Sequence, residues 1–85
     1  MGKYEKLLQQ VLGGRADANV AFGDMRQLLL RLGFDERTRG DHFIFSREGV
    51  EEILNLQPRG GMAKPYQVRQ VRNVILRYGM GVEDE

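Results

Sequence analysis

The sequence of 85 residues predicts an α+β fold, in which helices pack on one face of a three-stranded antiparallel sheet. Three observations lead to this prediction. Apolar residues recur at helical spacing towards both ends of the chain, they alternate with polar residues in the middle, and glycines separate these segments. A chain of this length supplies one small core, so we expect a single domain over residues 1–85.

Two amphipathic helices are expected in the N-terminal part of the chain. In residues 3–12 the apolar side chains follow the i, i+3, i+4, i+7 pattern, and Gly13 with Gly14 should end this helix. After a polar loop over residues 15–21, a second helix should be capped by Gly23 or Asp24 and should end at Gly33. Its inner face is expected to consist of Met25, Leu28, Leu29 and Leu32.

Three strands are expected next. Residues 34–39 and 42–45 should form a hairpin that turns at Gly40, and residues 52–57 should add the third strand. Successive side chains of a strand point to opposite faces of its sheet. The face towards the helices should therefore carry Phe43, Phe45, Leu54 and Leu56. The open face should carry His42, Ile44, Ile53 and Asn55.

Pro65 is well placed to begin the last helix. The buried stripe of this helix should consist of Val68, Val71, Ile75 and Tyr78. Arg69 and Arg72 should lie outside that stripe. The preceding Gly60–Gly61 pair is expected to be a flexible connector, because the lysine and the strand–loop–helix pattern of a phosphate-binding loop are missing.

The composition excludes several kinds of site. The chain has no cysteine and one histidine, so neither a disulfide framework nor a Cys-based or His-rich metal site can form, and we expect no metal and no cofactor. No apolar run approaches the roughly 20 residues that a membrane-spanning helix needs. We therefore expect a soluble cytoplasmic protein without a membrane partner.

The charges are distributed unevenly, although the net charge is only +1. Residues 53–82 carry no acidic side chain, and an acidic tail within residues 81–85 follows them. The basic residues of this segment are Arg59, Lys64, Arg69, Arg72 and Arg77. Such asymmetry favours a surface that binds phosphate groups, and the alternative is an ordinary solvated helix face.

With these elements placed, the chain resembles the HicA family of small toxins from prokaryotic toxin–antitoxin systems. The resemblance covers about residues 22–80 and rests on three segments: Leu-Leu-Leu-Arg-Leu-Gly-Phe at 28–34, Arg-Gly-Asp-His-Phe-Ile-Phe at 39–45, and the helix that begins Lys-Pro-Tyr-Gln-Val-Arg at 64–69. The hairpin of that family reads Gly-Ser/Thr-His before a bulky strand, so its functional histidine falls on His42.

The resemblance implies a double-stranded-RNA-binding-domain-like fold, cleavage of mRNA by an endoribonuclease, and inhibition by a HicB-type antitoxin protein. The chain departs from the family in two respects. Asp41 stands where the family has a hydroxyl residue, which places a negative charge where an RNA phosphate would approach. A helix over residues 3–12 precedes the usual start of the family.

On this resemblance His42 is the expected catalytic residue, acting as a general acid or base. Histidine suits this role because it exchanges protons between about pH 5 and 8, and the 2′-hydroxyl of RNA supplies the nucleophile. The expected RNA-binding residues are Arg39, Gly40, Arg59, Lys64, Tyr66, Arg69 and Arg72. Ile44 and Ile53 are expected to form the interface with the inhibitor. The alternative is a catalytically weak RNA-binding or protein-interaction module of the same fold, in which His42 is an ordinary surface residue.

Overall fold

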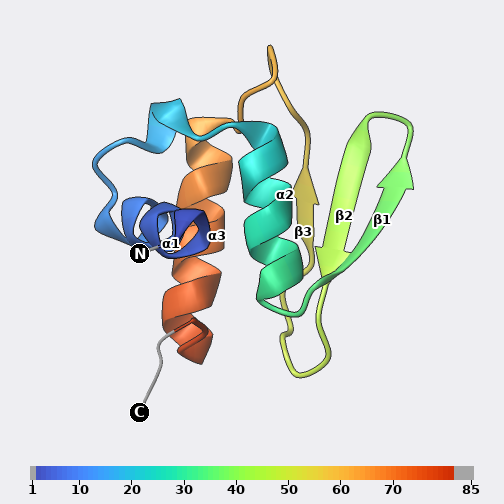
Figure 1. The fold of residues 1–85 in the computed structure, drawn as a ribbon. Helices are drawn as coiled ribbons and strands as arrows, with labels where there is room; N and C mark the ends of the chain where they lie inside the picture. The colour runs from blue at the N-terminus through green and yellow to red at the C-terminus, as the bar shows by residue number, and fades with distance from the viewer. Residues whose placement is uncertain (1, 82–85) are drawn as a thin grey trace.

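The computed structural model describes residues 2–81, and it has the predicted α+β architecture (Figure 1). Three strands form one antiparallel sheet in the order β1–β2–β3. In chain order the elements are α1 (Lys3–Gly13), the 3₁₀ turn η1 (Asp17–Asn19), α2 (Phe22–Arg31), β1 (Asp35–Arg39), β2 (His42–Ser46), β3 (Leu54–Leu56) and α3 (Pro65–Tyr78).

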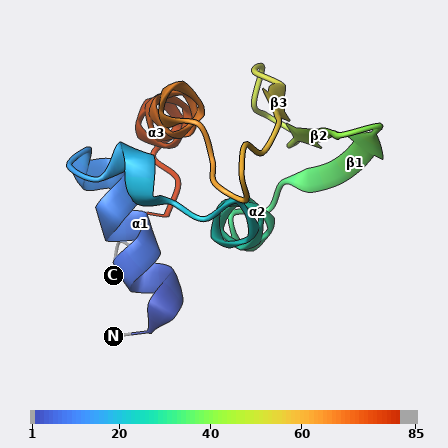
Figure 2. The same cartoon turned by 90° about the horizontal axis from the view of Figure 1, so that it is seen from above.

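The elements are arranged in layers, which Figure 2 shows from above. The helices α2 and α3 lie on one face of the sheet, and α1 lies on the side of these helices that is away from the sheet, in contact with both of them. No helix within residues 2–81 is long and apolar enough to cross a membrane. The opposite face of the sheet is left uncovered by the described elements, and the predicted open face is therefore confirmed.

The hairpin between β1 and β2 turns at the predicted position. Arg39 pairs with His42 across the turn, and Gly40 has a φ of 59°, a value that glycine adopts without the steric cost of a Cβ atom. On the face towards the helices, Glu36 accepts two hydrogen bonds from Arg26 of α2, at 2.7 and 3.1 Å. This ion pair holds the edge strand β1 to the helical layer.

The third strand is shorter than the predicted range of residues 52–57. The chain before Leu54 leaves the ladder because α3 binds it: the Glu51 N–H donates to the Tyr78 hydroxyl at 3.1 Å, and that hydroxyl donates to the Glu52 carboxylate at 2.7 Å. Ile53 consequently precedes the strand and is 64% exposed.

The core lies between the sheet and the helices and extends to α1. Phe45, Leu54 and Leu56 are fully buried, as predicted. Phe43 faces the helices but is only partly buried, because it lies at the rim of the core in edge-to-face contact with Phe22. The buried inner face of α2 confirms the prediction for Met25, Leu28, Leu29 and Leu32, and that of α3 for Val68, Val71 and Ile75.

Helix boundaries agree with the sequence at four of the predicted ends, including the start of α1 at Lys3, and differ at one. Gly14 and Gly33 adopt positive φ values after α1 and α2, and α3 begins at Pro65. The start of α2 was predicted wrongly: Ala21 is its N-cap, and Gly23 and Asp24 lie in its first turn. Here the Phe22 N–H donates to the Gly61 carbonyl at 2.9 Å, so a tertiary hydrogen bond replaces the expected side-chain cap.

The chain after α3 returns to the N-terminal helix. Met80 is buried, and Gly81 adopts a φ of 73° so close to α1 that a Cβ atom there would lie 2.9 Å from Leu8 Cδ2. This turn locks α1 against the rest of the core. Most of the acidic tail expected at residues 81–85 lies outside the described residues.

Candidate catalytic and RNA-binding surface

His42 begins β2 and lies on the open face of the sheet, where its side chain is 48% exposed. Its Nδ1 atom lies 3.0 Å from Oδ1 of Asn55, which projects from β3 on the same face. The alternation of β2 explains the placement, because Phe43 and Phe45 point towards the helices and turn His42 outwards. The sequence placed Asn55 on this face without assigning it a role.

The second nitrogen of the imidazole faces a carboxylate. Nε2 of His42 lies 3.8 Å from Oδ1 of Asp41, whose other oxygen accepts a hydrogen bond of 2.7 Å from Gln57. The hydrogen bond from Gln57 is the main cause that holds the pKa of the Asp41 carboxyl below its usual range, and the charges of His42 and Lys64 act in the same direction. Asp41 is therefore ionised at neutral pH beside the candidate catalytic group.

The backbone of Gln57 is bound by a buried side chain of the core. The buried side chain of Gln67, in the amide orientation that satisfies both of its polar atoms, pairs with the backbone of Gln57. Its oxygen accepts from the Gln57 N–H at 3.0 Å and its nitrogen donates to the Gln57 carbonyl at 3.3 Å. Gln67 of α3 thus fixes the backbone of Gln57, whose side chain binds Asp41.

Replacing Gln57 with leucine is expected to raise the pKa of Asp41 towards its usual value, because the largest stabilising interaction of the carboxylate is lost. A carboxyl with a depressed pKa stabilises the fold above its unfolded-state pKa, and this contribution disappears as the pH falls through the folded-state pKa. The variant should therefore lack this contribution near neutral pH, and its stability should fall less steeply than that of the wild type as the pH is lowered.

The measurement is a carbon-13 NMR titration of the Asp41 carboxyl group. Gln70→Leu, the same change on the exposed side of α3, is the control and should leave the titration of Asp41 unchanged. An Asp41 titration that is identical in Gln57→Leu and in the wild type would show that the hydrogen bond has no influence on this site.

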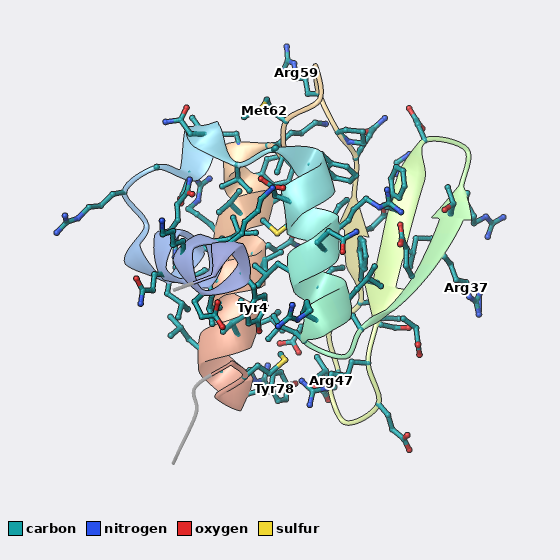
Figure 3. All side chains as sticks on the ribbon, viewed as in Figure 1. Tyr4, Arg37, Arg47, Arg59, Met62 and Tyr78 are labelled. Carbon is teal, nitrogen blue, oxygen red and sulfur yellow. The ribbon has the colours of Figure 1, made fainter. Side chains whose placement is uncertain are left out.

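Two arginines share the open face with His42. Arg39 is the register partner of His42 and Arg37 that of Ile44, and opposed residues of antiparallel strands point to the same face. In Figure 3 Arg37 extends from the outer side of β1, away from the helices. Arg37 was missed at the sequence level, although the alternation that places Arg39 on this face places Arg37 there too.

The two predicted interface residues separate in the structure. Ile44 is partly buried on the open face, two residues along β2 from His42. Ile53 was expected beside His42, and this is wrong, because the register of β2 and β3 places it beyond Leu54, the partner of Phe45. At about 3.4 Å per residue it lies on the order of 13 Å along the sheet from His42.

A second group of predicted residues lies in the connection from β3 to α3. Arg59, Lys64 and Tyr66 line one pocket together with Met62 and Pro65. The Gly60–Gly61 pair forms a tight turn rather than a flexible connector: Arg59 and Met62 exchange two backbone hydrogen bonds of 2.9 and 3.0 Å across it. Figure 3 shows Arg59 at the tip of this connection, at the same end of the molecule as the β1–β2 turn in Figure 1.

Arg72 does not belong to this surface. It was predicted to lie outside the buried stripe with Arg69, but only 17% of its side chain is exposed. Its Nη1 atom donates to the Val11 carbonyl at 3.1 Å and to Asp17 at 3.0 Å, so it joins α3 to the end of α1 and to η1. Arg69, one helical turn after Tyr66, is exposed as predicted.

The basic side chains of residues 53–81 fall into two groups, those that form ion pairs within the protein and those that do not. Arg72 pairs with Asp17, and Arg77 pairs with Glu52 at 2.7 Å. Within residues 2–81 the structure records no ion pair for the remaining basic residues of this segment, which are Arg59, Lys64 and Arg69. These three side chains can offer their charge to an external anion.

The arrangement can move a proton next to positive charge without a metal ion. The described residues contain no group of three potential ligands placed to hold a metal ion. An exposed imidazole with one nitrogen bound to an amide can exchange a proton at the other nitrogen, and Arg39 lies opposite it on the neighbouring strand.

No family model, no curated protein and no solved structure matches this chain.

Proposed function

We propose that this protein is a HicA-like toxin, an endoribonuclease that cleaves mRNA with His42 as its general base. The single observation that carries the proposal is the placement of the only histidine on the uncovered sheet face, with Nδ1 held by Asn55 and with Arg39 as its cross-strand neighbour. This is the arrangement that base-catalysed cleavage of a phosphodiester requires: a proton acceptor beside a cation.

The topology supports the same assignment. The segment α2–β1–β2–β3–α3 places both helices on one face of a three-stranded antiparallel sheet, as expected of a double-stranded-RNA-binding-domain-like fold. In this view α1 is an addition that packs on the far side of α2 and α3.

In the proposed reaction, Nε2 of His42 takes the proton of the 2′-hydroxyl while the 2′-oxygen forms a bond to phosphorus. The bond from phosphorus to the 5′-oxygen then breaks, and this oxygen takes a proton from water. Arg39 stabilises the negative charge of the phosphorane. A well-placed general base contributes about 10²- to 10⁴-fold to the rate, and positioning of the RNA supplies further acceleration.

The pocket between β3 and α3 is the proposed binding surface for the rest of the RNA chain. Arg59 and Lys64 would contact phosphate groups there, and the half-exposed ring of Tyr66 would stack on a base. Arg69 continues the positive charge along α3. A HicB-type antitoxin that covers the open face around His42 and Ile44 would exclude RNA from the site.

One observation favours the second candidate function, a catalytically weak RNA-binding or protein-interaction module. The Asp41 carboxylate lies 3.8 Å from Nε2 of His42, the position that a substrate phosphate must approach. A fixed negative charge there repels phosphate and slows cleavage, while the basic residues around Tyr66 would still bind RNA.

Induced expression of the protein is expected to arrest cell growth, and full-length transcripts should disappear at the same time. The purified protein should cleave the same RNA with undiminished rate in EDTA, leaving 2′,3′-cyclic phosphate and 5′-hydroxyl ends, because the proposed mechanism uses the internal nucleophile and no metal. RNA binding without cleavage would support the second candidate function. Neither binding nor cleavage would contradict both candidates.

A further inference from the structure

The contact between His42 and Asn55 has a direction that is set by chemistry. The Asn55 atom that faces the imidazole is the amide oxygen Oδ1, 3.0 Å from Nδ1. With the amide in this orientation Oδ1 is the acceptor, so the contact is a hydrogen bond only when Nδ1 carries the proton. In the neutral ring the proton is then absent from Nε2.

We propose that Asn55 is a positioning residue that fixes His42 in the Nδ1–H tautomer and so presents Nε2 as the proton acceptor. The inference rests on the proposed function, because it assigns Nε2 the 2′-hydroxyl proton. The hydrogen bond made by one ring nitrogen of a histidine determines which chemistry remains available at the other. Without Asn55 both tautomers are open to the exposed ring.

The sheet makes Asn55 a rigid support for this purpose. Its neighbours Leu54 and Leu56 are 1% and 0% exposed, so both sides of the residue are anchored in the core. Asn55 is the register partner of Ile44, which places it diagonally across from His42, within reach of a side-chain contact on one face. A functional group held from such an element keeps its geometry better than one held from a loop.

The other charged groups around the ring are compatible with this role. Asp41 lies 3.8 Å from Nε2, and its ionised carboxylate favours a proton on Nε2, so the hydrogen bond to Asn55 has to outweigh this attraction in the neutral ring. Once Nε2 has taken the substrate proton, the same carboxylate stabilises the imidazolium. Arg39, on the opposite strand, donates only and does not compete with Asn55 for the proton on Nδ1.

The decisive experiment is long-range proton–nitrogen NMR of the imidazole, recorded at a pH high enough for the ring to be neutral. The chain has one histidine, so its ring signals need no assignment. In the wild type the signal of Nδ1 is expected to be that of a protonated nitrogen and the signal of Nε2 that of an unprotonated one. In Asn55→Leu the two signals should move towards each other as both tautomers become populated.

Two further variants separate positioning from structure. Asn55→Asp keeps an acceptor oxygen in place and should retain the wild-type tautomer, whereas Asn73→Leu makes the leucine change on the exposed side of α3 and should alter nothing. In cleavage assays Asn55→Leu should lower kcat by about 10- to 100-fold, the range known for hydrogen-bond partners that orient metal-binding histidines, with KM nearly unchanged. Asn55→Ser, too short to reach the ring, should behave like Asn55→Leu and guards against a folding defect caused by leucine.

The outcomes distinguish this inference from the proposed function. A wild-type ring protonated at Nε2, or a tautomer that survives in Asn55→Leu, overturns the role of Asn55 even if the protein cleaves RNA. The expected tautomers in a protein that cleaves no RNA would support the positioning and contradict the nuclease assignment. A higher KM with an unchanged kcat in Asn55→Leu would show that Asn55 contacts RNA directly. This result would also overturn the inference.

Discussion

Replacing His42 with alanine is expected to lower the rate of RNA cleavage by at least about 100-fold, the contribution of a general base, and to abolish growth arrest on expression. The free energy of unfolding should change by less than about 0.5 kcal/mol, as for other surface substitutions. The reason is the placement of the side chain, which is 48% exposed and lies on the open face of the sheet, opposite Arg39 of β1. Transcript decay and urea unfolding of both proteins measure the two quantities.

Ser46→Ala is the matched control, because Ser46 is exposed on the same strand and the same face at the far end from the turn. It should cleave RNA at the wild-type rate. Cleavage by His42→Ala at that rate would end the catalytic hypothesis. A large loss of stability in His42→Ala would identify the histidine as a structural residue, contrary to its position.

The largest effect on stability outside the apolar core is expected for Arg72→Met. Arg72 and Asp17 are 17% and 15% exposed, and the guanidinium also binds the Val11 carbonyl at 3.1 Å. Removing one member of a largely buried ion pair leaves the other charge without a partner and costs about 3 kcal/mol. Urea unfolding should show this loss, and the additional change Asp17→Ala should restore part of it by removing the stranded carboxylate.

The same variant tests whether Arg72 takes part in RNA binding. Each phosphate contact on a single strand contributes about 0.7 to the slope of log K against log salt. Replacing Arg59, Lys64 and Arg69 together should flatten this slope by about two units. Arg72→Met should leave the slope unchanged at a temperature where it is folded, and a flatter slope would return Arg72 to the RNA-binding surface.

The sequence predicted those features that depend on local periodicity. Alternation along residues 42–45 was sufficient to bury Phe45 and to expose His42, and the helical stripe identified Val68, Val71 and Ile75 as core residues. Pro65 began its helix as expected, since proline fits the first helical position. Each of these results follows from the geometry of one element alone.

The features that were missed depend on which elements become neighbours. Periodicity placed Arg72 at the margin of the α3 stripe, but only the tertiary fold brings Asp17 beside it from a loop that the sequence described as merely polar. The pairing of His42 with Asn55 requires the register of β2 against β3, which residue types do not specify in strands of this length. The shortened third strand likewise reflects the hydroxyl of Tyr78, contributed by the last helix.

The packing of α1 against α3 and against the turn at Met80–Gly81 determines when α1 can fold into the core during translation. Leu8 and Val11 leave the ribosome before α3 and this turn, yet their burial requires both. The sheet also depends on α3, because the buried face of α3 packs against β3 and Gln67 binds the backbone of Gln57. Contacts between distant parts of a chain form only when both parts exist. The open face around His42 therefore cannot be completed until the ribosome has passed the codons for α3.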